Sequence, residues 1–162
     1  MSQISIENYV STDNLLQNCE GITLYDGKTN IDSVIEFQKG DILLSNIRPY
    51  LKKIWIADRD GGCNADVLVI RMNNDSFAPE FLYQILCRQE FFDYVMQDVK
   101  GMKMPRGNKN HIMQYSVPNV SRDEQKSILL EVKEYKQKIC EMKSVMITCE
   151  SRKKAVLKKH LS

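Results

Sequence analysis

The last forty residues carry a seven-residue apolar repeat, which restricts the fold more than any other feature of the chain. Between Arg122 and Leu161 there is neither Pro nor Gly. Apolar residues recur there at steps of four and three, and finally seven, at Ile128, Val132, Tyr135, Ile139, Met142, Met146, Cys149 and Val156. This seam predicts one continuous helix packed lengthwise on another helix. At about 1.5 Å per residue it would be roughly 60 Å long, so we expect it to project beyond its own domain and hold a partner.

Both ends of this helix have the expected signals. Ser121 and Glu124 form the Ser–x–x–Glu pattern of a capping box. Acidic residues occupy the first turn and lysines crowd the last turns, as the helix dipole favours. The alternative is a long helix folded back on its own domain. The strict seven-residue repeat favours pairing between molecules, because a helix on a globular core usually shows a broader apolar stripe.

Length and composition indicate one domain over residues 1–120, followed by the helical segment 121–162. No stretch of eighteen apolar residues and no signal-peptide pattern occurs, so we expect a soluble protein without a membrane segment. The five cysteines show no Cys–x–x–Cys pairing. An odd, unpatterned set indicates reduced thiols and a cytoplasmic location.

The net charge of +2 hides an asymmetry along the chain. Residues 122–162 carry eleven Lys or Arg against six Asp or Glu, whereas the first 121 residues carry twelve against fifteen. Two basic runs stand out in this acidic body, one from Arg48 to Lys53 and one from Lys100 to Lys109. A basic run is usually a solvated surface, but two of them favour an anionic partner at one place.

The body is expected to be α+β: a domain of short mixed strands, ahead of the long coiled-coil helix. Asp60–Gly61–Gly62 is expected to be a tight turn, with a hairpin between the strands around Trp55 and Val69. A single helix should run from Pro79 to about Asp98, followed by a polar, basic loop from Gly101 to Asn110. The expected strands are 22–25, 34–37, 41–45, 53–57, 66–72 and 112–117.

No catalytic pattern assembles in this sequence. Neither histidine has a metal-ligand partner at the usual spacing, so we expect no metal site and a structural or DNA-facing role for His111. Nucleophile elbows and phosphate-binding glycine loops are absent from the sequence. Nuclease-like Glu–x–Lys triplets occur only on the helical segment, where they are more simply surface charges. We therefore expect no catalytic residues, and a nuclease is the least favoured alternative.

Several segments, taken in order, resemble a known family. They are Gly40–Asp–Ile–Leu–Leu–Ser–Asn–Ile–Arg–Pro–Tyr50, the helix from Phe81 to Val95, the loop from Gly101, and Val117–Pro–Asn–Val–Ser–Arg–Asp–Glu–Gln125 opening the long helix. Together they resemble a target recognition domain of the specificity subunits of type I restriction–modification systems. The resemblance extends from about Tyr9 onward. Such subunits usually hold two recognition domains and two long helices. This sequence has one of each, as a natural half-subunit, a detached domain or a fragment would.

The resemblance implies a non-enzymatic protein that binds one half of a bipartite double-stranded DNA target. Its helix would dock DNA adenine methyltransferase subunits of a DNA methylation and restriction system. S-adenosylmethionine, ATP and Mg would belong to partner subunits, leaving no cofactor in this chain. The alternative from another class is a coiled-coil adaptor without nucleic-acid binding, which the acidic body favours mildly. Salt-dependent binding to a duplex would discriminate between the two.

Specific residues and an assembly follow from this interpretation. Lysines suit phosphate contacts, Arg106 can pair with guanine, and Asn108 or Asn110 with adenine. The alternative is that the basic segment from Gly101 to Asn110 is a flexible, solvent-exposed loop that contacts no ligand. We further expect a homodimer through antiparallel helices, which would read an interrupted palindrome. The predicted DNA contacts are Arg48, Tyr50, Lys52, Lys53, Lys100, Lys103, Arg106, Asn108, Lys109 and Asn110.

Overall fold

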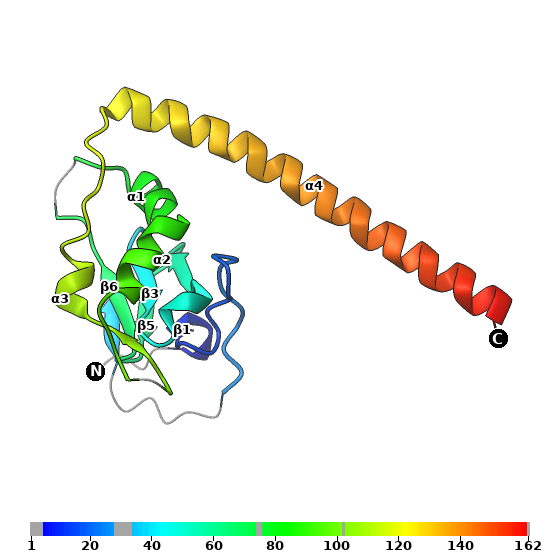
Figure 1. Ribbon diagram of the computed structural model, residues 1–162, viewed down its shortest axis with the longest axis horizontal. Helices are drawn as coiled ribbons and strands as arrows, with labels where there is room; N and C mark the ends of the chain where they lie inside the picture. The colour runs from blue at the N-terminus through cyan, green and yellow to red at the C-terminus, as the bar shows by residue number, and fades with distance from the viewer. Residues whose placement is uncertain (1–4, 28–33, 74–75, 102, 162) are drawn as a thin grey trace. The chain divides into compact units, whose positions relative to one another are not determined.

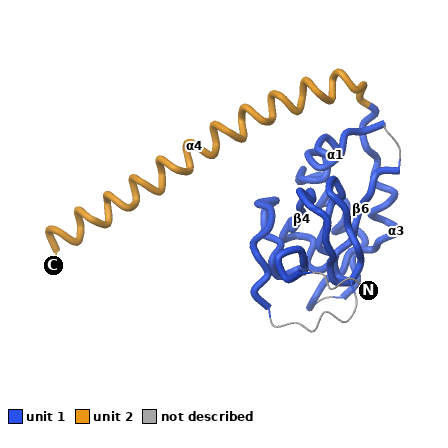
Figure 2. Tube along the Cα trace, turned by 180° about the vertical axis from the view of Figure 1, so that it is seen from behind, with its two compact units in different colours: residues 1–119 blue, residues 120–162 orange. Residues whose placement is uncertain are grey.

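The computed structural model describes residues 5–27, 34–73, 76–101 and 103–161 (Figure 1). Met102 of the predicted basic loop and Ser162 of the predicted helical segment lie outside the described residues. The chain divides into two compact units, residues 1–119 and residues 120–162, coloured separately in Figure 2. The first combines short strands with short helices, and the second is one long helix. The predicted α+β class with a long C-terminal helix is confirmed.

Two three-stranded sheets form the centre of unit 1 among its described residues. One has the order β1–β5–β2, in which β1 (Tyr9–Val10) runs parallel and β2 (Ile35–Phe37) antiparallel to β5 (Gly61–Cys63). The other has the order β4–β3–β6, fully antiparallel, and contains β3 (Ile42–Ser45), β4 (Ile54–Ile56) and β6 (Val67–Ile70). The prediction located β2, β3, β4 and β6, each slightly too long.

The central strand β3 separates two apolar clusters, which explains its unbroken apolar run. Ile42 and Leu44 belong to the cluster that includes the helices, while Leu43 belongs to a second cluster with Val10 and Phe37 of the other sheet. Alternate residues of a strand point to opposite faces. All four residues of β3 are therefore buried.

Two helices were found where one was predicted. α1 (Pro79–Leu86) and α2 (Gln89–Met96) are separated by Cys87 and Arg88, and Arg88 has an extended backbone (Figure 1). At about 100° per residue, a straight helix would place Phe91 roughly 180° away from Leu82. Both side chains are buried in one cluster, and the break makes this possible. The prediction of a single helix was wrong because it did not consider that Leu82 and Phe91 have to be buried in the same cluster.

The predicted turn and hairpin at Asp60–Gly61–Gly62 were also wrong. Gly61 begins β5, and a Cβ there would lie 2.2 Å from the Asn8 carbonyl oxygen and 2.6 Å from Phe37 Cζ. The glycine therefore permits close packing inside a sheet. Trp55 and Val69 do not pair with each other, because both pair with Leu43 from opposite sides.

Other predicted elements differ from the structure as well. Residues 22–25 form only an isolated bridge at Ile22, and residues 112–117 form no strand. Ile112 instead ends the short helix α3 (Lys109–Ile112). Strands β1 and β5 were missed, since they are short and rely on partners distant in sequence. The chain also contains the 3₁₀ turns η1 (Ile6–Asn8) and η2 (Pro49–Leu51).

The long helix α4 (Arg122–Leu161) has the predicted bounds and the predicted cap. The Glu124 N–H donates to Ser121 Oγ at 3.3 Å, and the Ser121 N–H donates to Glu124 Oε2 at 3.1 Å. The Ser121 hydroxyl also donates to Glu124 Oε2 at 2.7 Å, and this bond, together with the one from the Ser121 N–H, lowers the pKa of Glu124. The capping box is confirmed, and it satisfies amide groups that the first turn would otherwise leave unpaired.

Candidate nucleic-acid interface

The two basic runs of the sequence lie side by side in unit 1. The backbone continues from β3 through Asn46 and Ile47, and this extension pairs with β8 (Arg106–Gly107). The Gly107 N–H donates to the Asn46 carbonyl at 3.0 Å, and the Arg48 N–H donates to the Pro105 carbonyl at 2.8 Å. Segments more than fifty residues apart in sequence therefore form one surface.

A short hairpin carries most of the second basic run. β7 (Val99–Lys100) pairs antiparallel with β8, so Lys100 lies directly opposite Arg106. Gly107 anchors the hairpin, because a Cβ there would come within 3.0 Å of Asn46 Oδ1 and of Ile112 Cδ1. Gly101 has a φ of +87°, which suits the turn after β7. The segment predicted to be a loop is thus an anchored hairpin followed by the first residues of α3.

Arg106 and Lys100 form an arrangement that is unfavourable without a counter-ion. Like charges directly opposite each other in an antiparallel pair destabilise a sheet. Arg106 exposes 53 % of its side chain and pairs with Asp66 through Nη1–Oδ1 at 2.9 Å, while Lys100 is exposed. One carboxylate accompanies two cations, so the hairpin presents an excess of positive charge.

The first basic run forms a tight turn around η2. Arg48 before it and Lys52 after it both have left-handed backbones, with φ values of 50° and 52°. Such values are uncommon for residues with a Cβ. Tyr50, between them, exposes 51 % of its surface. Lys52 Nζ donates to Gln89 Oε1, and Lys53 Nζ donates to the Thr12 carbonyl at 2.6 Å. Arg48 and Tyr50 are therefore the more accessible members of this run.

The residues after the hairpin divide into supporting and exposed groups. Asn108 caps α3 by accepting the Asn110 N–H at 3.0 Å, and its Nδ2 donates to Asp98 Oδ2 at 2.7 Å. Both ends of its amide are thus engaged within the protein. Lys109 and Asn110 are exposed.

His111 is held by Tyr94 in a way that indicates a structural role. The two rings stack with centroids 4.0 Å apart and an interplanar angle of 11°. The Tyr94 hydroxyl donates to the His111 carbonyl at 3.0 Å, and His111 Nε2 lies 2.9 Å from the Tyr94 carbonyl oxygen. Since a carbonyl can only accept, Nε2 carries the proton in this contact.

Sequence reasoning missed three residues of this surface. Asp66 pairs with Arg106, Asp98 orients Asn108, and Met104 is 48 % exposed between Lys103 and Pro105. Asp66 lies far from the second basic run in sequence, and Asp98 lies just before that run. No local pattern therefore connects either aspartate to the run. Met104 could have been noticed as an apolar residue in a basic segment.

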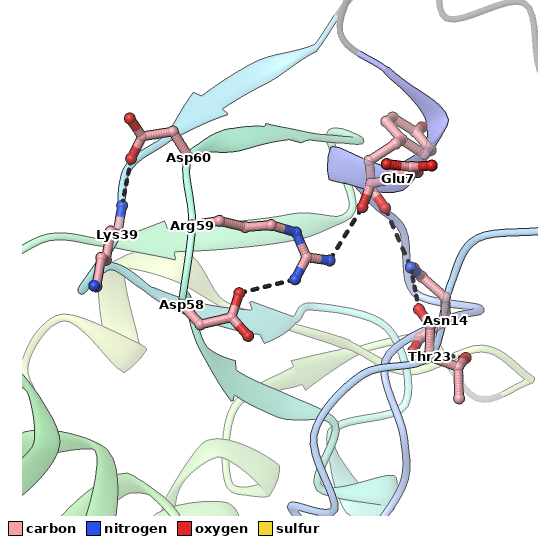
Figure 3. Close-up of polar contacts among 8 residues, drawn as sticks. Glu7, Asn14, Thr23, Lys39, Asp58, Arg59 and Asp60 are labelled. Atoms are coloured by element: carbon pink, nitrogen blue, oxygen red, sulfur yellow. Dashed lines mark hydrogen bonds and ion pairs between the residues drawn. The ribbon is translucent and has the colours of Figure 1, made fainter.

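A second arginine, Arg59, shows what a structural cation looks like in this protein. Its Nη1 donates to Asp58 Oδ1 at 2.8 Å and its Nη2 to the Glu7 carbonyl at 3.0 Å (Figure 3). Its guanidinium also lies 5.4 Å from the centre of the Trp55 ring. Nearby, the Lys39 N–H donates to Asp60 Oδ1 at 2.7 Å (Figure 3). The bond from Arg59 to Glu7 connects this arginine to the N-terminal segment, so we leave Arg59 out of the interface.

The seam of α4 is a separate candidate surface. Among its residues Ile139, Met142 and Met146 are more than half exposed, Cys149 is exposed and Val132 is half-buried. Further exposed apolar side chains lie outside the seam, at Leu130, Val145, Ile147 and Leu157. The apolar surface of α4 is therefore broader than the seam alone.

Within the described ranges, no group of three or more His, Cys, Asp or Glu side chains could hold a metal ion. No helix in that part of the chain has both the length and the apolar character needed to cross a membrane.

Comparison with known proteins gives one sequence relative and similar solved structures. No family model matches the chain. It is 32 % identical over 111 residues to the type I restriction enzyme EcoDI specificity subunit of Escherichia coli, an alignment covering 68 % of this chain and 24 % of that protein. The chain thus spans about a quarter of the length of this relative.

Two solved structures have a similar fold. The HsdS subunit from Thermoanaerobacter tengcongensis matches with a TM-score of 0.68 and 24 % identity, over 93 % of this chain and 41 % of that one. A chain from a structure describing complex assembly and conformational transition of the type I R-M system matches with a TM-score of 0.75 and 21 % identity, over 95 % and 42 %. The resemblance found in the sequence is therefore confirmed: in sequence and in fold, this chain is related to the specificity subunits of type I restriction–modification systems.

Proposed function

We propose that the chain is a non-catalytic DNA-recognition component of a type I restriction–modification system, and that unit 1 binds one half of a bipartite target. The observation that carries this proposal is the pairing of β8 with the extension of β3, which joins the two basic runs in one surface. The role named for the Escherichia coli relative supports it. It also supports the prediction that the chain itself is not an enzyme.

Within this proposal the basic surface divides into positioning and reading residues. Lys100, Lys103 and Lys109 are exposed and suit phosphate contacts, which position a protein without reading sequence. Arg106 and Asn110 are the candidates for base contacts to guanine and adenine. Asn108 supports them by capping α3.

Alanine substitution tests this surface. The triple variant Lys103→Ala, Arg106→Ala, Lys109→Ala should bind duplex DNA weakly and with a flatter salt dependence. Arg106→Ala alone should cost about 1–3 kcal/mol and relax preference at one base pair. Lys39→Ala with Arg88→Ala, exposed cations outside the surface, is the control. Parent-like binding by the triple variant would exclude this surface. Absence of salt-dependent binding by the parent would favour the adaptor alternative.

We also propose that α4 pairs with α4 of a second copy in antiparallel orientation. Residues 122–141 carry five basic and five acidic side chains, whereas residues 142–161 carry six basic and one acidic. A parallel pair would bring the two basic halves together, and like charges repel. An antiparallel pair would place each basic half beside a neutral one.

Charged substitutions test the seam. Ile139→Lys with Met142→Lys would bury unpaired charge in a paired seam and should split the dimer. Gln137→Lys with Ser144→Lys adds the same charge on the opposite side of the helix and should leave the dimer intact. Light scattering at tens of micromolar measures the outcome. A monomeric parent chain would leave only pairing with a different chain.

The cysteines of α4 provide an independent check. Cys149 lies in the seam and Cys140 outside it, and both are exposed in the single chain. In the proposed dimer a maleimide should label Cys140 faster than Cys149. Equal rates would contradict pairing through this seam.

The broader apolar surface of α4 is proposed to dock adenine methyltransferase subunits. Leu130 and Ile147 are each 65 % exposed and lie on the helix well away from the seam, so in the proposed dimer they would remain accessible. S-adenosylmethionine, ATP and Mg would then belong to those partners. Co-purification with a candidate methyltransferase, followed by methylation mapping, tests this part. Failure to co-purify would contradict it.

Twofold pairing would make the target an interrupted palindrome with one half-site for each copy. Deleting one heptad from α4 should change the permitted gap between half-sites and leave each half-site unchanged. A single contiguous target would contradict this arrangement.

A further inference from the structure

The β7–β8 hairpin exposes an apolar side chain among cations. Met104 is 48 % exposed and follows Lys103, while Lys100 and Arg106 lie across from each other on the two strands. Scattered exposed apolar residues are common on protein surfaces, so exposure alone assigns nothing to Met104. Its position at the end of a fixed, cationic hairpin is the informative feature.

The backbone holds Met104 in a defined place. A Cβ on Gly101 would lie 3.2 Å from the Met104 carbonyl oxygen, so the two residues close the hairpin tightly. The next residue, Pro105, is buried, and its carbonyl accepts the Arg48 N–H. The backbone of Met104 therefore lies close to Gly101 and leads into a buried, hydrogen-bonded residue, whereas its side chain is exposed.

The shape of the hairpin indicates which part of DNA it would meet. The major groove of B-DNA admits a two-stranded ribbon. With Lys100 near the phosphates and Arg106 directed at a base, the end of the hairpin would also lie close to the base edges. In that groove the base edges present hydrogen-bonding groups and one apolar group, the C5-methyl of thymine.

We propose that Met104 contacts the C5-methyl group of a thymine in the major groove and is a specificity-determining residue of the interface. This inference rests on the proposed DNA binding by unit 1. The contact would bury the thymine methyl against a flexible, polarizable thioether side chain. The same side chain opposite a guanine or cytosine edge would leave polar groups unpaired, which is unfavourable. Met104 would thus favour one base and disfavour others.

Replacement of thymine by deoxyuridine removes only the methyl group and tests the contact. The parent chain first selects its target from a random duplex library, and each thymine of the selected half-site is then replaced in turn. At one position the parent should lose about fourfold in affinity, the change that corresponds to about 0.8 kcal/mol for one buried methyl. Met104→Ala should bind both duplexes equally, and Met104→Leu should keep the preference for thymine.

Met113→Ala removes another exposed methionine of unit 1 and is the matched control. It should keep the preference for thymine. If Met104→Ala retains the full effect of the methyl group, or if no thymine of the selected half-site shows one, the inference is overturned while DNA binding stands. If the parent selects no duplex at all, the proposed function fails and the inference fails with it.

Discussion

Phe91 in α2 is completely buried, whereas Ile139 in α4 is 52 % exposed, and the same contrast holds across the two units. Unit 1 packs its large apolar side chains into two clusters around β3. In α4 the one buried side chain of the described residues is Gln125, whose Nε2 donates to the Val120 carbonyl at 2.8 Å. Burial of apolar area is the main favourable term in folding. Unit 1 therefore contains its own source of stability, whereas α4 leaves its apolar surface exposed, which is why we propose a partner for it.

Truncating a core side chain of unit 1 should have the largest effect and should leave α4 unaffected. Phe91→Ala is expected to lower the free energy of unfolding of unit 1 by about 3–5 kcal/mol, because it leaves a cavity. Trp55, the single tryptophan, lies in the core of unit 1, so its fluorescence reports that unit alone. Met113→Ala should change little. The helices of unit 1 should lose their share of the circular dichroism signal together with the fluorescence, and loss of the α4 share as well would mean that the two units unfold as one.

The buried carboxylate of Asp41 should give unit 1 an acid-sensitive contribution to stability that the α4 seam lacks. Arg71 Nε and Nη2 donate to its two oxygens at 2.8 and 2.6 Å, and the Gln38 N–H donates at 2.7 Å. Burial alone would raise the pKa of Asp41, but the bonds from Arg71 and Gln38 outweigh it and lower the pKa below 3.8. The carboxylate therefore stabilises the folded state above about pH 4, and this contribution is lost as the pH falls through the lowered pKa.

Asp41→Asn should accordingly lower the stability of unit 1 by about 1.5–3 kcal/mol at neutral pH, the range for hydrogen bonds to charged groups. The difference between parent and variant should shrink as the pH is lowered toward 3. Denaturant unfolding followed by Trp55 fluorescence at several pH values measures it. A difference that does not change with pH would show that the charge of Asp41 has no role.

Dilution should distinguish the stability of α4 from that of unit 1 without any substitution. If α4 is stabilised by pairing with a second copy, tenfold dilution should weaken its folding by about 1.4 kcal/mol. The stability of unit 1 should not depend on concentration. Helical circular dichroism and Trp55 fluorescence, recorded on the same samples, compare the two. A helix signal that does not depend on concentration would contradict pairing.

The cap of α4 should have the smallest effect. Ser121→Ala removes the acceptor for the Glu124 N–H and should cost about 1 kcal/mol of helix stability. The change should appear in the circular dichroism transition of α4 and not in the fluorescence of unit 1. Ser127→Ala, inside the helix, is the control. If both variants behave alike, the cap contributes nothing to α4.

The parts of the fold that were predicted correctly are those specified by neighbouring residues. The bounds and the cap of α4 follow from local patterns, and β3 is a run of apolar residues after the Gly40–Asp41 turn. The division between α1 and α2 was not predictable in this way, because it depends on which cluster buries Phe91. The same holds for Gly61, whose role becomes clear only when Asn8 and Phe37 are placed beside it.

The residues of the candidate interface could be predicted from the sequence, but the contacts that hold them together could not. The basic residues of the two runs were visible in the sequence, and most of them are exposed. Nothing in the sequence indicated that Arg48 would bond to the backbone of Pro105, or that Arg106 would pair with Asp66. Contacts between distant segments depend on the path of the whole chain.

The left-handed backbones of Arg48 and Lys52 have a consequence for engineering this protein. Each such residue costs about 1–2 kcal/mol relative to a relaxed backbone, and glycine would adopt the same φ without that penalty. A search for thermostable variants should therefore favour glycine at both positions. If Arg48 contacts DNA as proposed, selection for heat resistance would remove a contact that selection for binding keeps. Stability and recognition would then compete at a single turn of the chain.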